Sequence, residues 1–225
     1  MEDLYTLNMG RSLGNVRRIG LMGGTFDPIH IAHLIVAEEV YTALGLTEMV
    51  FIPAGHPPHK LARASTSSHH RFAMVELAIA SNPHFSISRV EIDRPGPSYL
   101  VDTLRLLHTQ WGPQVELSFV IGWDSLEDFP TWYDPVGILA QLTHLVAVRR
   151  PGYVEDVAYN QQLETRLPGI TERLQVVSVP QLDISSSDLR RRVAEHRSIK
   201  YQTVEVVERY IIEHGLYQNT DEGNR

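Results

Sequence analysis

Short apolar segments alternate with longer amphipathic segments along most of this chain, and that alternation limits the folds it can adopt. The short segments are apolar almost throughout, as is typical of strands buried on both faces of a parallel sheet. The longer segments carry apolar residues at helical spacing. The expected strands are Arg18–Met22, Glu48–Ala54, Glu116–Gly122, His144–Arg150 and Leu174–Pro180. The expected helices are Ile31–Leu44, Ser68–Ser81, Ser98–Gln110, Val154–Leu167, Ser187–Glu195 and Val204–His214.

This order of elements predicts an α/β fold with a doubly wound, mainly parallel sheet. The 225 residues are enough for one sizeable core, and no internal repeat or linker divides them. We therefore expect a single domain over residues 18–217, with a flexible N-terminal extension over 1–17 and a flexible tail over 218–225. In such a fold, ligands bind at the carboxyl ends of the strands.

Composition excludes several classes of function. The chain has no cysteine, which rules out disulfides, thiolate metal sites and thiol nucleophiles. Its 20 basic and 27 acidic residues give a net charge of −7, which argues against a nucleic acid or a membrane surface as the partner. No stretch approaches the roughly 18 apolar residues of a membrane span. We expect a cytoplasmic protein with small-molecule ligands; composition does not indicate its oligomeric state.

The segment GGTFDPIHIAH, residues 23–33, lies where the first strand leads into the first helix. We expect the strand to end near Met22, so that both glycines lie in a loop that lets a ligand approach the backbone. His30 and His33 then share one side of the first helical turn, where free amides suit a phosphate. Two other interpretations stay open on spacing alone. The chain has eleven histidines, so these two could be incidental, or they could be a His-x-x-His metal pair.

Several motifs together resemble a known family. GGTFDPIHIAH resembles the GxFDPxHxGH loop of the nucleotidylyltransferase superfamily, and ISSSDLRRRV resembles its ISST-x-IR motif. Between and after them lie IPAGHPPHK, PGPSYLVDTL, IGWDSLEDFPTWYDP, VRRPGY and VVERYIIEHGLY. In this order they resemble the bacterial nicotinate-nucleotide adenylyltransferases, from about Ile19 to Tyr217. This chain departs from the family pattern at three positions, with Ala32 for Gly, Ser187 for Thr and Leu100 for Thr.

The resemblance implies a Rossmann-like nucleotidyltransferase fold and a specific reaction. Nicotinate mononucleotide and ATP would give deamido-NAD and pyrophosphate, as the mononucleotide phosphate attacks the α-phosphorus of ATP. That phosphate is already ionised at neutral pH, so the reaction needs no general base. Catalysis would come from positioning and from stabilising charge on the phosphates. The resemblance also implies Mg²⁺ bound with ATP, and we expect no metal ligands from the protein.

The resemblance further implies which residues form the site. The catalytic residues would be His30, His33 and Arg190. The ATP-binding residues would be Gly23, Gly24, Thr25, Phe26, Ser185, Ser186 and Ser187. The mononucleotide-binding residues would be His59, Lys60, Tyr99, Leu100, Asp124, Trp132 and Arg150. Simpler roles stay open for some of them: a serine or Asp124 can cap a helix, and a tryptophan is most often a core residue.

Other functions compete with this one. The acceptor could be nicotinamide mononucleotide or pantetheine phosphate, although PSYLVDTL and FPTWYDP count against pantetheine. A module that senses ATP without turnover is a third alternative, and intact His30, His33 and Arg190 argue against it. Leu100 removes a hydroxyl near the expected pyridine site. We nevertheless expect a preference for the acid, because a helix capped by Ser98 would offer the backbone amides of residues 99–101 to a carboxylate.

Overall fold

The computed structural model describes residues 16–55, 66–149 and 157–218, and they form a six-stranded sheet flanked by helices. The strand order is β3-β2-β1-β4-β5-β6, and every neighbouring pair is parallel. This confirms the predicted doubly wound α/β fold. The strands are β1 (Arg17–Gly24), β2 (Glu48–Pro53), β3 (Phe85–Ile87), β4 (Val115–Gly122), β5 (His144–Arg149) and β6 (Leu174–Ser178).

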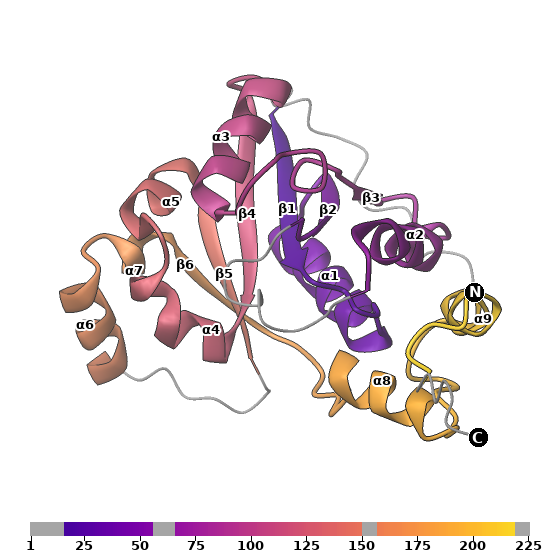
Figure 1. Ribbon diagram of the computed structural model, residues 1–225. Helices are drawn as coiled ribbons and strands as arrows, with labels where there is room; N and C mark the ends of the chain where they lie inside the picture. Colours follow the sequence, from indigo (N-terminus) through magenta and orange to yellow (C-terminus); the bar gives the residue numbers. More distant parts are fainter. Residues whose placement is uncertain (1–15, 56–65, 150–156, 219–225) are drawn as a thin grey trace, which may run out of the picture.

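Helices cover both faces of the sheet, as Figure 1 shows. One face is covered by α1 (Ile31–Leu44), α2 (Ser68–Ile79), α8 (Ser186–Ala194) and α9 (Glu205–Glu213). The other is covered by α3 (Leu100–Trp111), α4 (Trp123–Asp128), α5 (Pro135–Gln141), α6 (Val157–Arg166) and α7 (Ile170–Arg173). A short 3₁₀ turn, η2 (Phe129–Thr131), joins α4 to the loop before α5.

The two hydrophobic cores explain why the strands read as continuous apolar runs. Successive side chains of a strand point to opposite faces, so a strand between two helix layers needs apolar residues at every position. In β4, Phe119 and Ile121 belong to the core under α3–α7, whereas Val120 belongs to the core under α1 and α2.

The order of the strands reverses between β1 and β4. From β1 the chain winds outward through β2 to β3, and it then crosses back to β4 on the other side of β1. The connections leave the ends of β1 and β4 on opposite faces, which opens a crevice at their carboxyl ends. The segment with the two histidines follows β1 and therefore begins at this crevice.

Several boundaries differ from the sequence-based expectation. The first strand begins at Arg17, inside the expected extension, and it continues past Met22 because Gly23 and Gly24 pair with β2. The second helix ends at Ile79 rather than Ser81, and α3 begins at Leu100 rather than Ser98. The sequence did not predict β3, α4, η2, α5 or α7, which are too short to show a clear period.

Other expectations concern the chain ends and membranes. Residues 1–15 and 219–225 lie outside the described part, so the expected extension and tail are not tested over those residues. In the described ranges, no helix is long and apolar enough to cross a membrane.

Candidate active site

The two histidines lie against each other at the start of α1. His30 is the N-cap residue and His33 lies three positions on, with the rings stacked at a centroid distance of 3.6 Å. The backbone N–H of His30 donates to Nδ1 of His33 over 3.2 Å. Because Nδ1 of His33 accepts a hydrogen bond, the proton of the neutral ring is on Nε2. His33 can therefore donate one hydrogen bond from Nε2 to a ligand.

Burial keeps both imidazoles neutral in the absence of ligand. It lowers the pKa of His30 to about 4. The pKa of His33 falls to about 3, because burial is reinforced by the nearby charge that His30 would carry if protonated. At neutral pH the pair therefore supplies hydrogen-bond donors without net charge.

The start of α8 lies against the loop that follows β1. Ser186 Oγ donates to the Pro28 carbonyl over 2.8 Å, and Arg190 Nη1 donates to the Asp27 carbonyl over 2.6 Å. The helix of the SSSDLR motif therefore begins beside the predicted phosphate loop. Ser185 has the simpler role of a cap, because its hydroxyl accepts from the Asp188 amide. Ser187 accepts from Arg190 over 3.2 Å.

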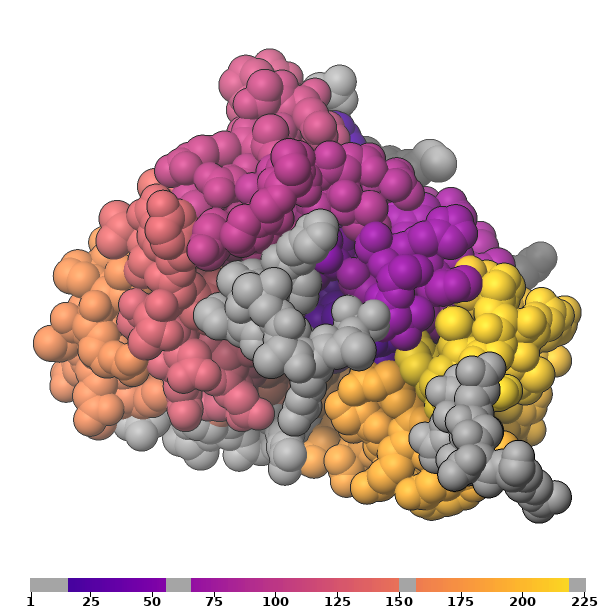
Figure 2. All heavy atoms as spheres, viewed as in Figure 1, coloured from indigo at the N-terminus to yellow at the C-terminus, as the bar shows by residue number. Residues whose placement is uncertain are grey.

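Two cavities meet at the reversal point of the sheet. On the face shown in Figure 2, the yellow segment of α9 lies against the purple segment of α2. The histidine cavity, of about 290 Å³, is lined by both imidazoles, Ala32, Val36 and residues at the end of β4. The aromatic cavity, of about 240 Å³, is lined by Tyr99, Leu100, Tyr133 and Glu91, among others. The residues that line both are Gly23, Phe119 and Trp132. Two ligands side by side would thus meet beside Gly23.

The aromatic cavity combines ring surfaces with a helix start. The rings of Tyr99 and Tyr133 lie 4.4 Å apart between centroids, and Trp132 borders both cavities. The expectation that Ser98 caps this helix is wrong, because Tyr99 is the N-cap residue and has an extended conformation. The Tyr99 amide donates to the Pro97 carbonyl. The helix therefore leaves the amides of Leu100 and Val101, rather than three amides, without an intrahelical acceptor.

The residues at the end of β1 pack closely against aromatic rings of the protein. A Cβ at Gly23 would lie 3.2 Å from the Phe119 ring, and one at Gly24 2.9 Å from the Phe26 ring. Close packing against protein rings therefore already requires small residues there. Phe26 is 2% exposed and its ring contacts His33 edge-on, so its side chain supports that imidazole. Thr25 lines the aromatic cavity.

The other predicted residues are not all brought together. Asp124 is exposed on the first turn of α4 and is not among the described residues that line the two cavities. His59, Lys60 and Arg150 lie outside the described residues.

Two buried charged residues beside the site were missed by the sequence analysis. Arg71 is 2% exposed and donates to the carbonyls of Thr25 and Ala54, over 2.8 and 2.6 Å. It thereby fixes the loops after β1 and β2. The available signal was its place on the apolar stripe of α2, beside Met74 and Val75. Glu91 accepts from Thr103 Oγ1 over 2.8 Å, and burial raises the pKa of its carboxyl group.

Comparisons with known proteins agree on the kind of protein. The cytidylyltransferase-like family model matches residues 21–192. A protein of Thermomicrobium roseum, described as "Probable nicotinate-nucleotide adenylyltransferase", is 49% identical over 91% of this chain and 93% of its own length. A Roseiflexus sp. (strain RS-1) protein with the same description is 48% identical over 89% of this chain and 98% of its own.

Solved structures share the fold. Plasmodium falciparum nicotinic acid mononucleotide adenylyltransferase complexed with NaAD superposes with a TM-score of 0.71 at 20% identity, covering 89% of this chain and 97% of that one. The same Plasmodium enzyme complexed with APC gives a TM-score of 0.66 at 21% identity, over the same shares of the two chains.

Proposed function

The chain belongs to the cytidylyltransferase-like family and, within it, to the nicotinate-nucleotide adenylyltransferases, and on that premise we propose that its two cavities hold the two substrates. The enzyme transfers the adenylyl group of ATP to nicotinate mononucleotide, which gives deamido-NAD and pyrophosphate. We assign ATP to the histidine cavity and the pyridine ring to the aromatic cavity. The observation that carries this assignment is that the cavities share Gly23, Phe119 and Trp132, so that two bound nucleotides would touch there.

The residues around the histidine cavity suit the phosphates of ATP. Nε2–H of His33 is a donor beside the cavity, at the start of α1, where the helix dipole also favours an anion. Arg190 adds a guanidinium, which donates a hydrogen bond to the Asp27 carbonyl in the loop after β1. Because the attacking phosphate is already an anion, these groups need only position the phosphates and stabilise the charge that moves to pyrophosphate.

The residues around the aromatic cavity suit nicotinate. Trp132 and Tyr99 offer ring faces for stacking on the pyridine, and the electron-rich face of an aromatic ring attracts a cationic pyridinium. The amide of Leu100, which lines the cavity at the start of α3, would receive the carboxylate. We keep His59, Lys60, Asp124 and Arg150 as proposed contacts of the mononucleotide, on the family resemblance alone.

Mg²⁺ bound with ATP completes the proposal. The donors beside the histidine cavity are imidazoles, hydroxyls and amides, whereas Mg²⁺ prefers oxygen ligands such as carboxylates and phosphates. The buried carboxylate nearby, Asp27, already accepts from Tyr217 and from the Thr66 amide. These residues fit an ion held on the ATP phosphates, where it would neutralise charge on pyrophosphate as it leaves.

The reaction is tested by supplying ATP with nicotinate mononucleotide, nicotinamide mononucleotide or pantetheine phosphate, and identifying the products by mass spectrometry. We expect deamido-NAD and stoichiometric pyrophosphate from the first acceptor. Dephospho-coenzyme A, or NAD at equal efficiency, would contradict the proposed acceptor. Binding of ATP without pyrophosphate release would favour a sensing module instead.

Removal of divalent cations tests whether turnover requires Mg²⁺. In excess EDTA we expect turnover to fall to background, and excess Mg²⁺ should restore it, because the phosphate charge is then neutralised again. Undiminished turnover in excess chelator would contradict this prediction.

A further inference from the structure

Two segments far apart in the sequence form the aromatic walls of the aromatic cavity. Tyr99 is the N-cap residue of α3, whereas Trp132 and Tyr133 lie just before α5. The Tyr99 and Tyr133 rings lie against each other, with 4.4 Å between centroids, so a bound pyridine ring would lie beside this pair. The shape of the cavity there depends on how the two segments are placed. The interactions that join the start of α3 to the start of α5 therefore bear directly on mononucleotide binding.

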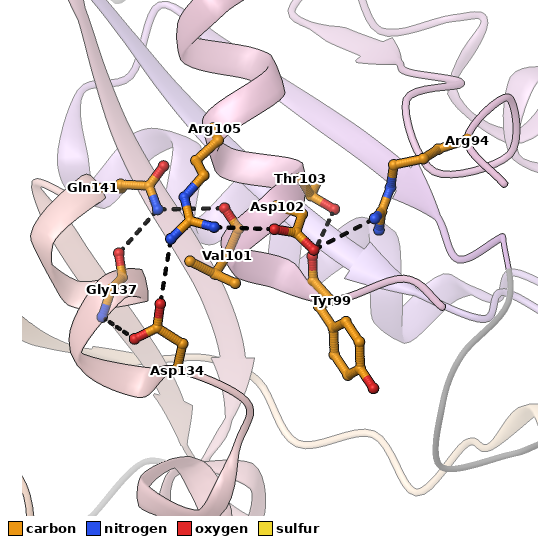
Figure 3. Close-up of polar contacts among 9 residues, drawn as sticks. All are labelled: Arg94, Tyr99, Val101, Asp102, Thr103, Arg105, Asp134, Gly137 and Gln141. Atoms are coloured by element: carbon orange, nitrogen blue, oxygen red, sulfur yellow. Dashed lines mark hydrogen bonds and ion pairs between the residues drawn. The ribbon is translucent and has the colours of Figure 1, made fainter. Parts of the chain in front are cut away.

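A line of charged groups joins these two helices outside the cavity (Figure 3). Arg105, on α3, contacts Asp102 Oδ1 with Nη1 over 3.1 Å and Asp134 Oδ2 with Nη2 over 3.3 Å. Asp102 is in the first turn of α3, and its other oxygen lies 3.5 Å from Arg94. One guanidinium thus bridges a carboxylate beside Tyr99 and a carboxylate beside Tyr133.

Asp134 determines the direction in which the chain passes from Tyr133 into α5. Its backbone is left-handed, with φ of 52°, and its Oδ1 accepts from the Gly137 amide over 2.9 Å as the cap of α5. A Cβ on Gly137 would collide with this carboxylate, so the glycine makes room for it. The Asp134 carboxylate is therefore fixed to α5, and a contact with it holds the chain at Tyr133.

A second contact joins the same two helices. Gln141 Nε2, at the end of α5, donates to the Val101 carbonyl over 3.3 Å and to the Gly137 carbonyl over 2.9 Å. This amide fixes the far end of α5 to the first turn of α3. Arg105 joins the two helices at the near end of α5, where the aromatic residues lie.

We propose that Arg105 is a positioning residue for nicotinate mononucleotide, because its bridge from Asp102 to Asp134 holds Tyr133 opposite Tyr99. This inference rests on the proposed function of the aromatic cavity. The Arg105 side chain is 58% exposed and is not among the residues that line that cavity, so it acts through Asp134 rather than on the substrate.

A simpler role for Arg105 would be attraction of an anionic substrate by its positive charge. The two roles predict opposite effects of neutralising Asp134. If charge alone matters, Asp134→Asn removes a repelling carboxylate and tightens mononucleotide binding. If the bridge matters, the same substitution releases Arg105 and weakens binding, while the amide oxygen still caps α5.

The experiment compares Arg105→Met, Asp134→Asn and the double variant with the wild type, by steady-state kinetics for both substrates and by calorimetric titration of nicotinate mononucleotide. We expect each single variant to raise KM and Kd for the mononucleotide by about two- to fivefold, the range that exposed ion pairs support. The double variant should be no worse than either single one. KM for ATP, kcat and the melting temperature should stay at the wild-type values.

A matched control and the salt dependence complete the test. Arg209→Met removes an exposed ion pair with Glu205 on α9, remote from the cavity, and should leave all constants unchanged. The difference between wild type and Arg105→Met should narrow as NaCl screens the bridge. Unchanged mononucleotide binding in Arg105→Met, or tighter binding in Asp134→Asn, would overturn the positioning role. A wild type that forms no deamido-NAD would instead overturn the function on which it rests.

Discussion

His33 illustrates how a single hydrogen bond fixes the chemistry of a side chain. Its Nδ1 accepts from the backbone N–H of His30, so the donor must be Nε2. Phe26 contacts the ring from the side and His30 covers its face, which leaves little freedom of orientation. A donor held in this way before the substrate arrives stabilises developing charge without reorganisation.

Replacing His33 by alanine should lower kcat by about 10²- to 10³-fold, which is the usual loss for one preorganised donor to a transition state. The KM values should change less than kcat, because the interaction strengthens as charge develops on the phosphates. Steady-state kinetics and a circular dichroism spectrum are the measurements. As a control, His84→Ala removes an exposed ring stacked on Tyr41 and should leave kcat unchanged. Near-wild-type turnover in His33→Ala would remove His33 from the catalytic residues.

The low pKa values also predict how stability depends on pH. In the unfolded chain a histidine titrates near pH 6.5, whereas the folded pKa values of His30 and His33 are about 4 and about 3. Between these values the unfolded state binds more protons, so acid favours unfolding. The stability associated with each neutral ring is fully present above pH 6.5 and is lost as the pH falls toward 3–4.

His33→Gln removes one of these titrating groups. Between pH 7 and pH 5 the wild type should lose up to about 2 kcal/mol more unfolding free energy than the variant does, because each pH unit below about 6.5 costs about 1.36 kcal/mol. Urea unfolding at the two pH values measures this difference. Equal losses in both proteins would mean that His33 is not held neutral by the fold.

At the level of the helix, we propose that the start of α3 recognises the substrate carboxylate with its backbone. The amides of Leu100 and Val101 precede the first intrahelical bond, which Asp102 makes to the Tyr99 carbonyl. Free amides and the helix dipole together favour a carboxylate. A carboxamide presents its own N–H₂ group and leaves polar groups unpaired, at roughly 1–3 kcal/mol each. The departure from the family at Leu100 therefore does not remove the recognition element.

We expect kcat/KM for nicotinate mononucleotide to exceed that for nicotinamide mononucleotide by at least about 10²-fold. Leu100→Thr should change this ratio only modestly, because both side chains leave the amide in place. Leu100→Pro should lower it about tenfold relative to Leu100→Ala, because proline deletes the N–H yet is tolerated at the first helical position. The extended conformation of Tyr99 is compatible with a following proline. A ratio near one in the wild type would contradict backbone recognition.

Over the whole molecule, the predicted phosphate loop, which lies near the start of the described chain, is held by segments from its C-terminal part. Asp27 is 4% exposed, and its Oδ1 accepts from the hydroxyl of Tyr217 over 2.7 Å. Its carbonyl accepts from Arg190 on α8. The end of the described chain thus closes onto the loop that follows β1.

Tyr217→Phe should lower the unfolding free energy by about 1–3 kcal/mol, because it leaves a buried carboxylate oxygen without its donor. Denaturant unfolding measures this change. Tyr201→Phe is the matched control, since Tyr201 is 84% exposed and its hydroxyl should contribute little. Equal stability of Tyr217→Phe and the wild type would contradict a structural role for this contact.

Local patterns in the sequence were enough to predict the sheet and the long helices. The central strands β1, β2, β4 and β5 were found because burial on both faces makes most of their residues apolar. Helix α1 has the predicted bounds because Gly45 ends it in a left-handed conformation. The residues of the histidine motif were found because a strand, a loop and a helix start follow one another in the chain. Periodicity, turns and caps depend on residues close together in the chain, so they can be recognised from the sequence alone.

The aromatic cavity required contacts that no local pattern encodes. Tyr99 caps α3 in place of Ser98, and Asp134 turns the chain in a left-handed conformation before a helix of only seven residues. Arg71, which the sequence analysis did not single out, donates to carbonyls just after the ends of two strands. Trp132 could have been an ordinary core residue, and it borders both cavities because β1 and β4 are neighbours in the sheet. Which distant segments become neighbours depends on the order of the strands and on packing between layers, and these arise only when the whole chain folds.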